Sequence, residues 1–194
     1  PAIGYFLVLM GKTCYKDAMR ISLLIIVLAA LMVTTVVRNE VWRDDGSIWS
    51  DTIEKTPKNA RAYNELGIHL SAAGKFADAL RVLNLSLALD PYQPQVYVNI
   101  GTTLEKLNRP EEAVKAYRLA IQYDPRDPTA YYNLGALFYT LYHDREQALH
   151  NFLIARDLNP REPDVHQYLG MIYRDRGDIA RAEEEFALFR YLKQ

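Results

Sequence analysis

The chain has 194 residues, of which 49% are hydrophobic and 24% are charged. That composition excludes a disordered or collagen-like protein, and the length suits one ordinary domain or a smaller domain with an appendage. The 23 basic and 24 acidic side chains give a formal net charge of −1, which argues against a protein that binds nucleic acid through phosphate contacts. The single cysteine, Cys14, excludes a disulfide scaffold and a cysteine-rich metal site.

Residues 1–20 begin with a hydrophobic stretch that is too short to cross a bilayer. A loop follows, in which Lys12, Lys16 and Arg20 outnumber one acid, Asp17. Because basic residues favour the cytoplasmic side of a membrane, we expect the end of a preceding hydrophobic segment here, followed by a cytoplasmic loop. Cys14 would then lie in the reducing compartment.

An apolar run comes next, which begins at Ile21, ends at Val37 and contains no charge, glycine or proline. At ~1.5 Å per residue, such a helix spans about 26 Å, the short end of the range for a transmembrane helix. Arg20 and Arg38 flank the run and can snorkel to the membrane surface. We predict a transmembrane helix in an inner or plasma membrane, with everything after Arg38 on the periplasmic or extracytoplasmic side. A buried helix in a soluble core is the alternative, which the lack of any polar face disfavours.

An internal repeat occupies the rest of the chain. Gly67, Gly101 and Gly135 are evenly spaced, and Gly170 comes one position later than the same spacing requires. Alanines and prolines keep the same period, and the extra residue falls between Gly135 and Ala148. Similarity at a fixed period of about 34 residues is typical of solenoid proteins.

Each unit has the pattern of two helices joined by a tight turn. In the first unit, Tyr63, Leu66 and Gly67 fall at i, i+3 and i+4, on one face of the first helix. Ala79 and Leu83 share one face of the second helix. The turns are expected to use residues that adopt a positive φ at low steric cost: Gly74, Asn108 and Gly177.

This pattern resembles the tetratricopeptide repeat (TPR). The resemblance implies an all-α TPR superhelix of about four helix-turn-helix repeats, over residues 60–93, 94–127, 128–162 and 163–194. It also implies that the first helix of each pair lines an inner groove.

Both flanks of the repeats carry further signals. Trp49 precedes Leu83 by one full period, so residues 38–59 are expected to hold a linker and a half-repeat helix that caps the stack. At the other end, large apolar residues have no following helix to cover them, namely Phe186, Phe189 and Tyr191. A repeat array normally ends in a polar cap, so further repeats or a partner subunit are expected there.

Two asparagines, Asn99 and Asn133, occupy the sixth position of their repeats. They resemble the asparagine ladder of the O-GlcNAc-transferase type of repeat, in which amides hold the backbone of an extended peptide. Glu65 and Tyr168 interrupt the ladder, so a solvated face is the alternative. The residues expected to contact a protein or extended peptide are Asn64, Val98, Asn99, Thr102, Tyr132, Asn133, Tyr139, Gln167, Met171 and Arg174.

The sequence contains no motif of a zinc hydrolase, a nucleotide-binding loop or a nucleophilic hydrolase. Its four histidines are dispersed, so we expect no catalytic residue, no metal site and no cofactor in this segment. His166 occupies a position that is aromatic in the other repeats, and we expect it to pack in the core. The glutamate run 183–185 is expected on a solvated helix face.

The junction from Arg38 to Gly67, with Trp42, Trp49 and Pro57, resembles a group of membrane proteins. These are the transmembrane and tetratricopeptide-repeat O-mannosyltransferases and their bacterial relatives, at the point where the last membrane helix meets the repeats. The resemblance implies the C-terminal region of a multi-pass glycosyltransferase that uses a lipid-linked sugar. Their catalytic loop has no counterpart here, so no catalytic residue carries over.

We therefore predict a membrane-anchored protein-interaction or scaffold module that faces the periplasm or lumen. Two contexts stay open. In the first, the chain is the substrate-docking arm of a multi-pass glycosyltransferase. In the second, it is a single-pass accessory subunit of a membrane or envelope complex, such as a pilus, secretion or respiratory assembly.

Overall fold

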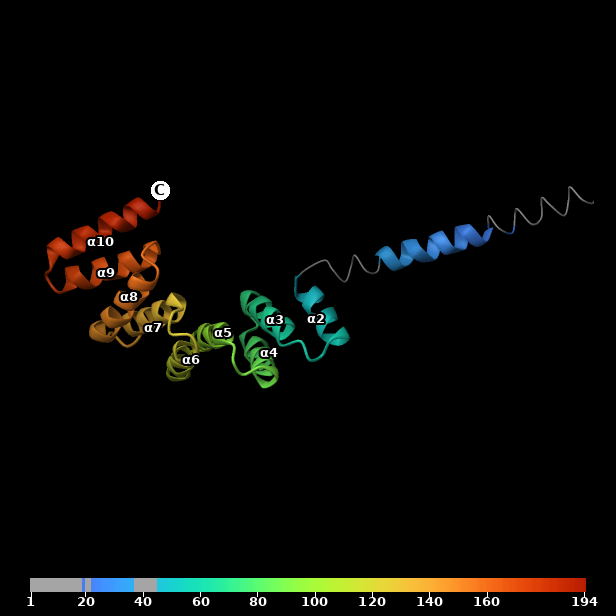
Figure 1. Cartoon of the computed structure of the whole chain (residues 1–194), viewed down its shortest axis with the longest axis horizontal. Coiled ribbons are helices and arrows are strands. Elements are labelled where there is room, and N and C mark those ends of the chain that lie inside the picture. The colour runs from blue at the N-terminus through green and yellow to red at the C-terminus, as the bar shows by residue number, and fades with distance from the viewer. Residues whose placement is uncertain (1–18, 20–21, 37–44) are drawn as a thin grey trace, which may run out of the picture. The chain divides into compact units, whose positions relative to one another are not determined.

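The structure is a computed structural model that describes residues 19, 22–36 and 45–194 (Figure 1). All regular secondary structure in these ranges is helical. The chain divides into two compact units, Pro1–Asp51 and Thr52–Gln194, and each is described by itself.

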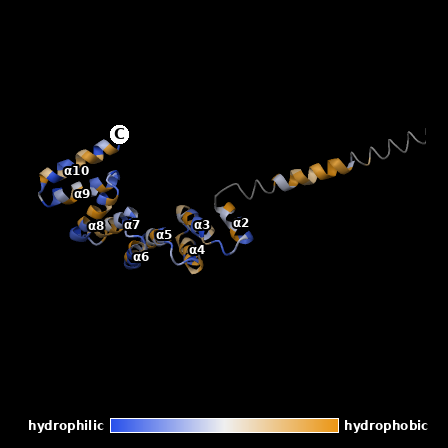
Figure 2. Ribbon diagram, in the orientation of Figure 1, coloured by the Kyte–Doolittle hydropathy of each residue, from blue (hydrophilic) through white to orange (hydrophobic). Residues whose placement is uncertain are grey.

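In the first unit, residues 22–36 form a helix that is hydrophobic along most of its length (Figure 2). The hydroxyls of Thr34 and Thr35 donate to the carbonyl oxygen of Leu31, at 2.8 and 2.7 Å. The two ends of the predicted membrane segment, Ile21 and Val37, lie outside the described residues. Within the described ranges, no helix combines the length and the hydropathy needed to cross a membrane.

The expectations for the loop at 11–18, including Cys14, and for the linker at 38–44 also lie outside the described residues. Helix α2 (Asp45–Lys55) lies where the sequence predicts the half-repeat helix. It crosses the boundary between the two units, and its role as a cap on the repeats stays a prediction.

Four helix pairs make up the second unit (Figure 1). The first helices of the pairs, here called A helices, are α3 (Ala60–Ala72), α5 (Pro94–Lys106), α7 (Pro128–Thr140) and α9 (Pro163–Asp175). The second helices, here called B helices, are α4 (Phe76–Leu89), α6 (Pro110–Tyr123), α8 (Arg145–Leu158) and α10 (Ile179–Leu192). Each A helix begins at the first residue of a predicted repeat, and each pair packs on the next. The predicted all-α repeat architecture is confirmed.

Local chemistry explains where these helices begin. Proline is the first residue of α5, α6, α7 and α9, a position where its missing N–H costs no intrahelical hydrogen bond. Four other side chains precede helices and accept a hydrogen bond from a backbone N–H of the first turn, which satisfies one of the unpaired donors there. These N-caps are Asn59, Asp127, Asp144 and Asp178.

The turns between A and B helices use the predicted left-handed residues. Gly74, Asn108 and Gly177 have φ values of 75°, 57° and 78°. The turn between α7 and α8 is one residue longer than the others, as the slip in the repeat period predicts, and there His143 adopts a φ of 53°. A histidine in this conformation was not predicted from the sequence.

The repeating glycines allow the two helices of a pair to approach closely. A Cβ atom on Gly67 would lie 2.6 Å from the side chain of Leu83, and one on Gly170 would lie 2.7 Å from the ring of Phe186. Real side chains do not pack at such distances, so each large B-helix residue needs a glycine opposite it. Alanines fill the remaining close contacts and are at most 2% exposed: Ala79, Ala113, Ala148 and Ala182.

Candidate functional site

Side chains from the fifth position of one repeat meet side chains from the sixth position of the next. Between α3 and α5, the amide Nδ2 of Asn99 donates to Oδ1 of Asn64 at 2.9 Å. Between α7 and α9, the rings of Tyr132 and Tyr168 meet edge to face, with centroids 6.1 Å apart. The same two positions therefore form an amide pair at one end of the array and an aromatic pair at the other.

The middle junction has neither arrangement, because its fifth position is Val98 and its sixth is Asn133. Val98 is 2% exposed, so it belongs to the core, which corrects the prediction that its side chain contacts a partner. Asn133 is half-buried and has no hydrogen bond to any described residue. Of the two predicted ladder asparagines, Asn99 thus uses one amide N–H within the chain, whereas the amide of Asn133 is free of hydrogen bonds to the described residues.

A tyrosine cluster, formed by Tyr132, Tyr139 and Tyr168, lies between α7 and α9. Tyr139 meets Tyr168 edge to face at 5.5 Å, and its hydroxyl donates to Sδ of Met171 at 3.8 Å. Below them, the buried ring of Phe152 stacks on Tyr168 with centroids 4.7 Å apart. The three tyrosines are half-buried, so they present ring surface and hydroxyls while a buried ring supports them.

Pockets open at both junctions. The first, of about 400 Å³, lies between α3 and α5 and includes Asn99, Thr102 and the cationic Lys106 among its lining residues. No acidic residue lines it. The second, of about 270 Å³, is here called the acidic pocket and is lined by Pro128, Thr129, Tyr132, Asn133, Ala155, Asn159, Glu162, Asp164 and Val165.

Two carboxylates set the electrostatics of the acidic pocket. Burial raises the pKa of Tyr132 to about 12, and the negative charges near it, including those of Asp164 and Glu162, contribute. Asp164 forms an ion pair with Lys193, with Nζ 3.1 Å from Oδ1. The carboxylate of Glu162 forms no hydrogen bond or ion pair with the described residues, although Glu162 is the N-cap of α9. Within the described part of the chain, one carboxylate of this pocket is therefore unpaired.

Among the other predicted contact residues, Thr102 lines the first pocket, whereas Gln167, Met171 and Arg174 line neither of these two pockets. The hydroxyl of Thr102 donates to backbone carbonyls of its own helix, at 3.0 Å for Asn99 and 3.3 Å for Val98. Arg174 is exposed, and its guanidinium carbon lies 5.7 Å from the centre of the Phe186 ring. Gln167 and Met171 are half-buried on α9.

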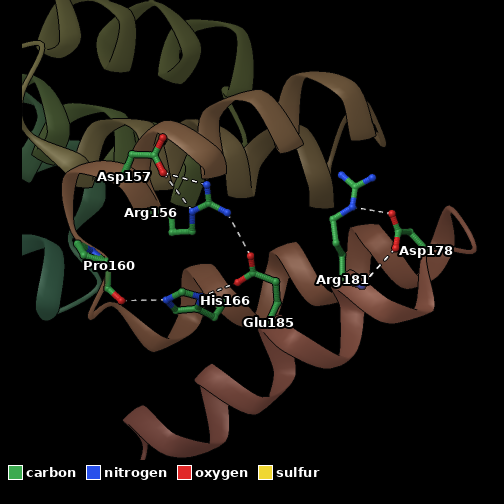
Figure 3. Close-up of polar contacts among 7 residues, drawn as sticks. All are labelled: Arg156, Asp157, Pro160, His166, Asp178, Arg181 and Glu185. Carbon is green, nitrogen blue, oxygen red and sulfur yellow. Dashed lines mark hydrogen bonds and ion pairs between the residues drawn. The ribbon is translucent and has the colours of Figure 1, made fainter.

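A buried polar network joins α8, α9 and α10 (Figure 3). Nδ1 of His166 lies 2.6 Å from Oε2 of Glu185, and Oε1 of Glu185 accepts from Nη1 of Arg156 at 3.2 Å. The other ring nitrogen, Nε2, lies 3.0 Å from the carbonyl oxygen of Pro160, which can only accept, so Nε2 carries a hydrogen. A proton is then required between His166 and Glu185 as well, because a bare nitrogen would face a bare carboxylate.

This network corrects one prediction and extends another. Glu185 is 7% exposed, so the glutamate run is not wholly on a solvated face. His166 is 2% exposed and does pack in the core, but as a hydrogen-bonding residue. The signal that could have revealed the network is the histidine itself, since the other three repeats have tyrosine at this position: Tyr63, Tyr97 and Tyr131.

Within the part of the chain that the structure describes, no three histidine, cysteine, aspartate or glutamate side chains come close enough to hold a metal ion. Asp157 completes the polar network by accepting from Arg156, with Nη2 2.9 Å from Oδ1. Because both carboxylates of this network bond to Arg156 or His166, the network is a structural element that joins the third and fourth repeats.

Comparison with known proteins identifies the repeats. A profile described as "TPR repeat" matches residues 106–141, and one described as "Tetratricopeptide repeat" matches residues 48–94 and 143–190. The chain contains a tetratricopeptide repeat domain. No curated protein sequence matches it significantly.

Solved structures share this fold. MamA residues 41 to the end, from Desulfovibrio magneticus RS-1, has a TM-score of 0.66 and 22% identity over 84% of this chain and 94% of that one. Another crystal structure of MamA gives 0.67 and 21% over 77% and 88%. YrrB, described as a TPR protein with an unusual peptide-binding site, gives 0.64 and 22% over 74% of each chain. At these identities the likeness shows the fold alone.

Proposed function

We propose that this chain is a membrane-anchored docking module that binds an extended segment of a partner protein along its A helices. The observation that carries the proposal is the tyrosine cluster of Tyr132, Tyr139 and Tyr168, next to the free amide of Asn133 and the acidic pocket. Tyrosines held rigid by packing are typical anchors of protein interfaces, because they offer large contact area at low cost in conformational entropy.

The free amide of Asn133 adds a second element of recognition. An amide offers both a donor and an acceptor, which suits the N–H and C=O of a peptide backbone. Asn99 has less of this freedom, because one N–H of its Nδ2 group already donates to Asn64. The partner segment is therefore expected to lie mainly along α7 and α9, and the predicted contacts of Asn64, Asn99 and Thr102 are expected to be minor.

The membrane anchor belongs to the same proposal. The uncharged run from Ile21 to Val37 supports it, and so do the basic residues that precede the run. The helix at 22–36 also satisfies its two threonine hydroxyls internally, which lowers the cost of placing them in lipid. In the proposed orientation, the basic residues that precede the run lie on the cytoplasmic side and the repeats lie outside the cytoplasm.

Two contexts for the module stay open, and the mass of the native protein separates them. As the docking arm of a multi-pass glycosyltransferase, a context that the sequence from Arg38 to Gly67 favours, it would be part of a much heavier chain. As an accessory subunit of an envelope complex, it would have a mass near 22.3 kDa. Intact-mass spectrometry of the protein purified from its native membrane in detergent distinguishes the two.

Site-specific photo-crosslinking in the native membrane tests the docking function. A benzoylphenylalanine at Tyr139 is expected to give one discrete adduct, and the same group at Arg118, which is exposed on α6, is expected to give none. Asn133→Ala is expected to weaken the Tyr139 adduct without reducing the amount of folded protein. The proposal is wrong if Tyr139 gives no adduct, or if Arg118 gives the same one.

A further inference from the structure

The acidic pocket beside α7 and α9 has a shape and a charge that suit one class of side chain. We infer that it receives an arginine side chain of the partner segment, with the guanidinium between the ring of Tyr132 and the carboxylates of Glu162 and Asp164. This inference rests on the proposed docking function and names the chemistry that the partner must supply.

Charge is the first argument. Two carboxylates, those of Glu162 and Asp164, line the pocket, and no basic residue lines it. One of the two already pairs with a cation, since Nζ of Lys193 lies 3.1 Å from Oδ1 of Asp164. The chain thus supplies one positive group for two negative ones, and the carboxylate of Glu162 is the one left without an ion pair among the described residues.

The unused polar groups are the second argument. A carboxylate at an N-cap position usually accepts a hydrogen bond from its own helix, as Asp127 does from the N–H of Thr129 at 2.9 Å. Glu162 does not do so for α9, and the amide of Asn133 is also free. The carboxylate of Glu162 and the amide oxygen of Asn133 are therefore acceptors in this pocket that make no hydrogen bond with the described residues.

Shape favours arginine over lysine. A planar guanidinium stacks on an aromatic ring and donates to two acceptors at once, whereas an ammonium is a compact, strongly hydrated charge. Tyr132 supplies the ring, while Glu162 and Asn133 supply carboxylate and amide oxygens. A volume of about 270 Å³ leaves room for one such side chain.

The pocket between α3 and α5 is a built-in control. It lies between the A helices of the first two repeats, toward their C-terminal ends rather than their N-terminal ends, and Lys106 lines it while no acidic residue does. A guanidinium should avoid that pocket, because like charges repel and no carboxylate compensates. One molecule therefore carries both the acidic pocket and a second pocket of opposite charge that is not expected to bind a guanidinium.

The experiment titrates the full chain, in detergent micelles, with N-acetyl-arginine methylamide and follows amide resonances by NMR. Saturable shifts are expected at the side-chain amide of Asn133 and the backbone N–H of Thr129, and no shift is expected at Ser71 in the other pocket. N-acetyl-citrulline methylamide, a neutral analogue of the same shape, is expected to bind about tenfold more weakly. Equal shifts from arginine and citrulline, or none at Asn133, would overturn the inference.

Variants then assign the effect to the carboxylates. Glu162→Gln combined with Asp164→Asn is expected to abolish the preference for arginine over citrulline. The same loss of two charges on an exposed face, in Glu183→Gln with Glu184→Gln, is expected to leave that preference unchanged. Lys193→Gln is expected to strengthen arginine binding, because it removes the competing cation. An unchanged preference in the first variant would contradict the assignment.

The outcome is separable from that of the docking function itself. If the Tyr139 adduct forms and survives Glu162→Gln with Asp164→Asn, while arginine shows no preference for the pocket, this inference fails and the docking function stands. If no adduct forms at Tyr139 but arginine still binds selectively, the pocket recognises the cation and the docking function fails.

Discussion

The first and last junctions of the groove use the same backbone positions for different chemistry. Between α3 and α5, the Nδ2 group of Asn99 donates to Oδ1 of Asn64, so the two side chains bond to one another across the junction. Between α7 and α9, Tyr132 and Tyr168 meet edge to face and leave ring surface uncovered. One repeat architecture thus forms a closed polar junction at one end and an open aromatic junction at the other, and the open one is suited to a partner.

Removing the ring that supports the aromatic junction is expected to have the largest effect. Phe152 is fully buried and stacks on Tyr168, so Phe152→Ala is expected to lower the free energy of unfolding by about 4 kcal/mol. Urea denaturation of the full chain in detergent micelles, followed by far-UV circular dichroism, measures it. Leu83→Ala is the matched change in the first repeat and is expected to cost about 3 kcal/mol. A smaller loss of unfolding free energy in Phe152→Ala than in Leu83→Ala would contradict the expectation that Phe152 supports the aromatic junction.

A polar network of Arg156, His166 and Glu185 joins the last two repeats. Glu185→Ala leaves the donors of His166 and Arg156 without their buried acceptor, and is expected to cost about 3 kcal/mol in the same assay. Its neighbour Glu184 is exposed, so Glu184→Ala is expected to change stability by less than about 0.5 kcal/mol. Equal effects of the two changes would show that the network contributes nothing to stability.

The positions of the helices could be predicted from the sequence because local chemistry determines them. The repeat period, the glycines opposite large residues and the prolines at helix starts each act within one repeat. The left-handed turn residues Gly74, Asn108 and Gly177 were predictable for the same reason. His143 was not, since histidine adopts that conformation only where the surrounding turn requires it.

The groove could be predicted only as a row of positions. Whether a residue there is free depends on the residue opposite it in the preceding repeat, which spacing alone does not reveal. Asn99 meets Asn64 and is paired, whereas Asn133 follows a repeat whose fifth position is the buried Val98. Glu185 was assigned to solvent for a similar reason, because its partners come from α8 and α9.

For the closed junction between α3 and α5, we predict a smaller effect on stability. Asn64→Ala, Asn99→Ala and the double variant form a cycle in which the coupling energy is expected to be about 1 kcal/mol, typical of a partly exposed neutral hydrogen bond. Urea denaturation of the four proteins measures it. Asn133→Ala is the control and is expected to leave stability nearly unchanged, because its amide has no hydrogen-bond partner among the described residues. A coupling near zero would mean that both amides are available to a partner, as in an open ladder.

The smallest expected effect on stability is that of removing the Tyr139 hydroxyl. The size of this effect shows whether the hydroxyl stabilises the packing of α7 against α9. Among the described residues, the hydroxyl donates only to the thioether of Met171, a weak acceptor at 3.8 Å. Tyr139→Phe is therefore expected to change the free energy of unfolding by less than about 0.5 kcal/mol. Tyr139→Leu also removes the edge-to-face contact with Tyr168 and is expected to cost about 1 kcal/mol. If Tyr139→Phe destabilised the chain as much as Tyr139→Leu, the hydroxyl would be holding α7 to α9. The aromatic junction would then be as closed as the amide junction, and the contrast between the two ends of the groove would be lost.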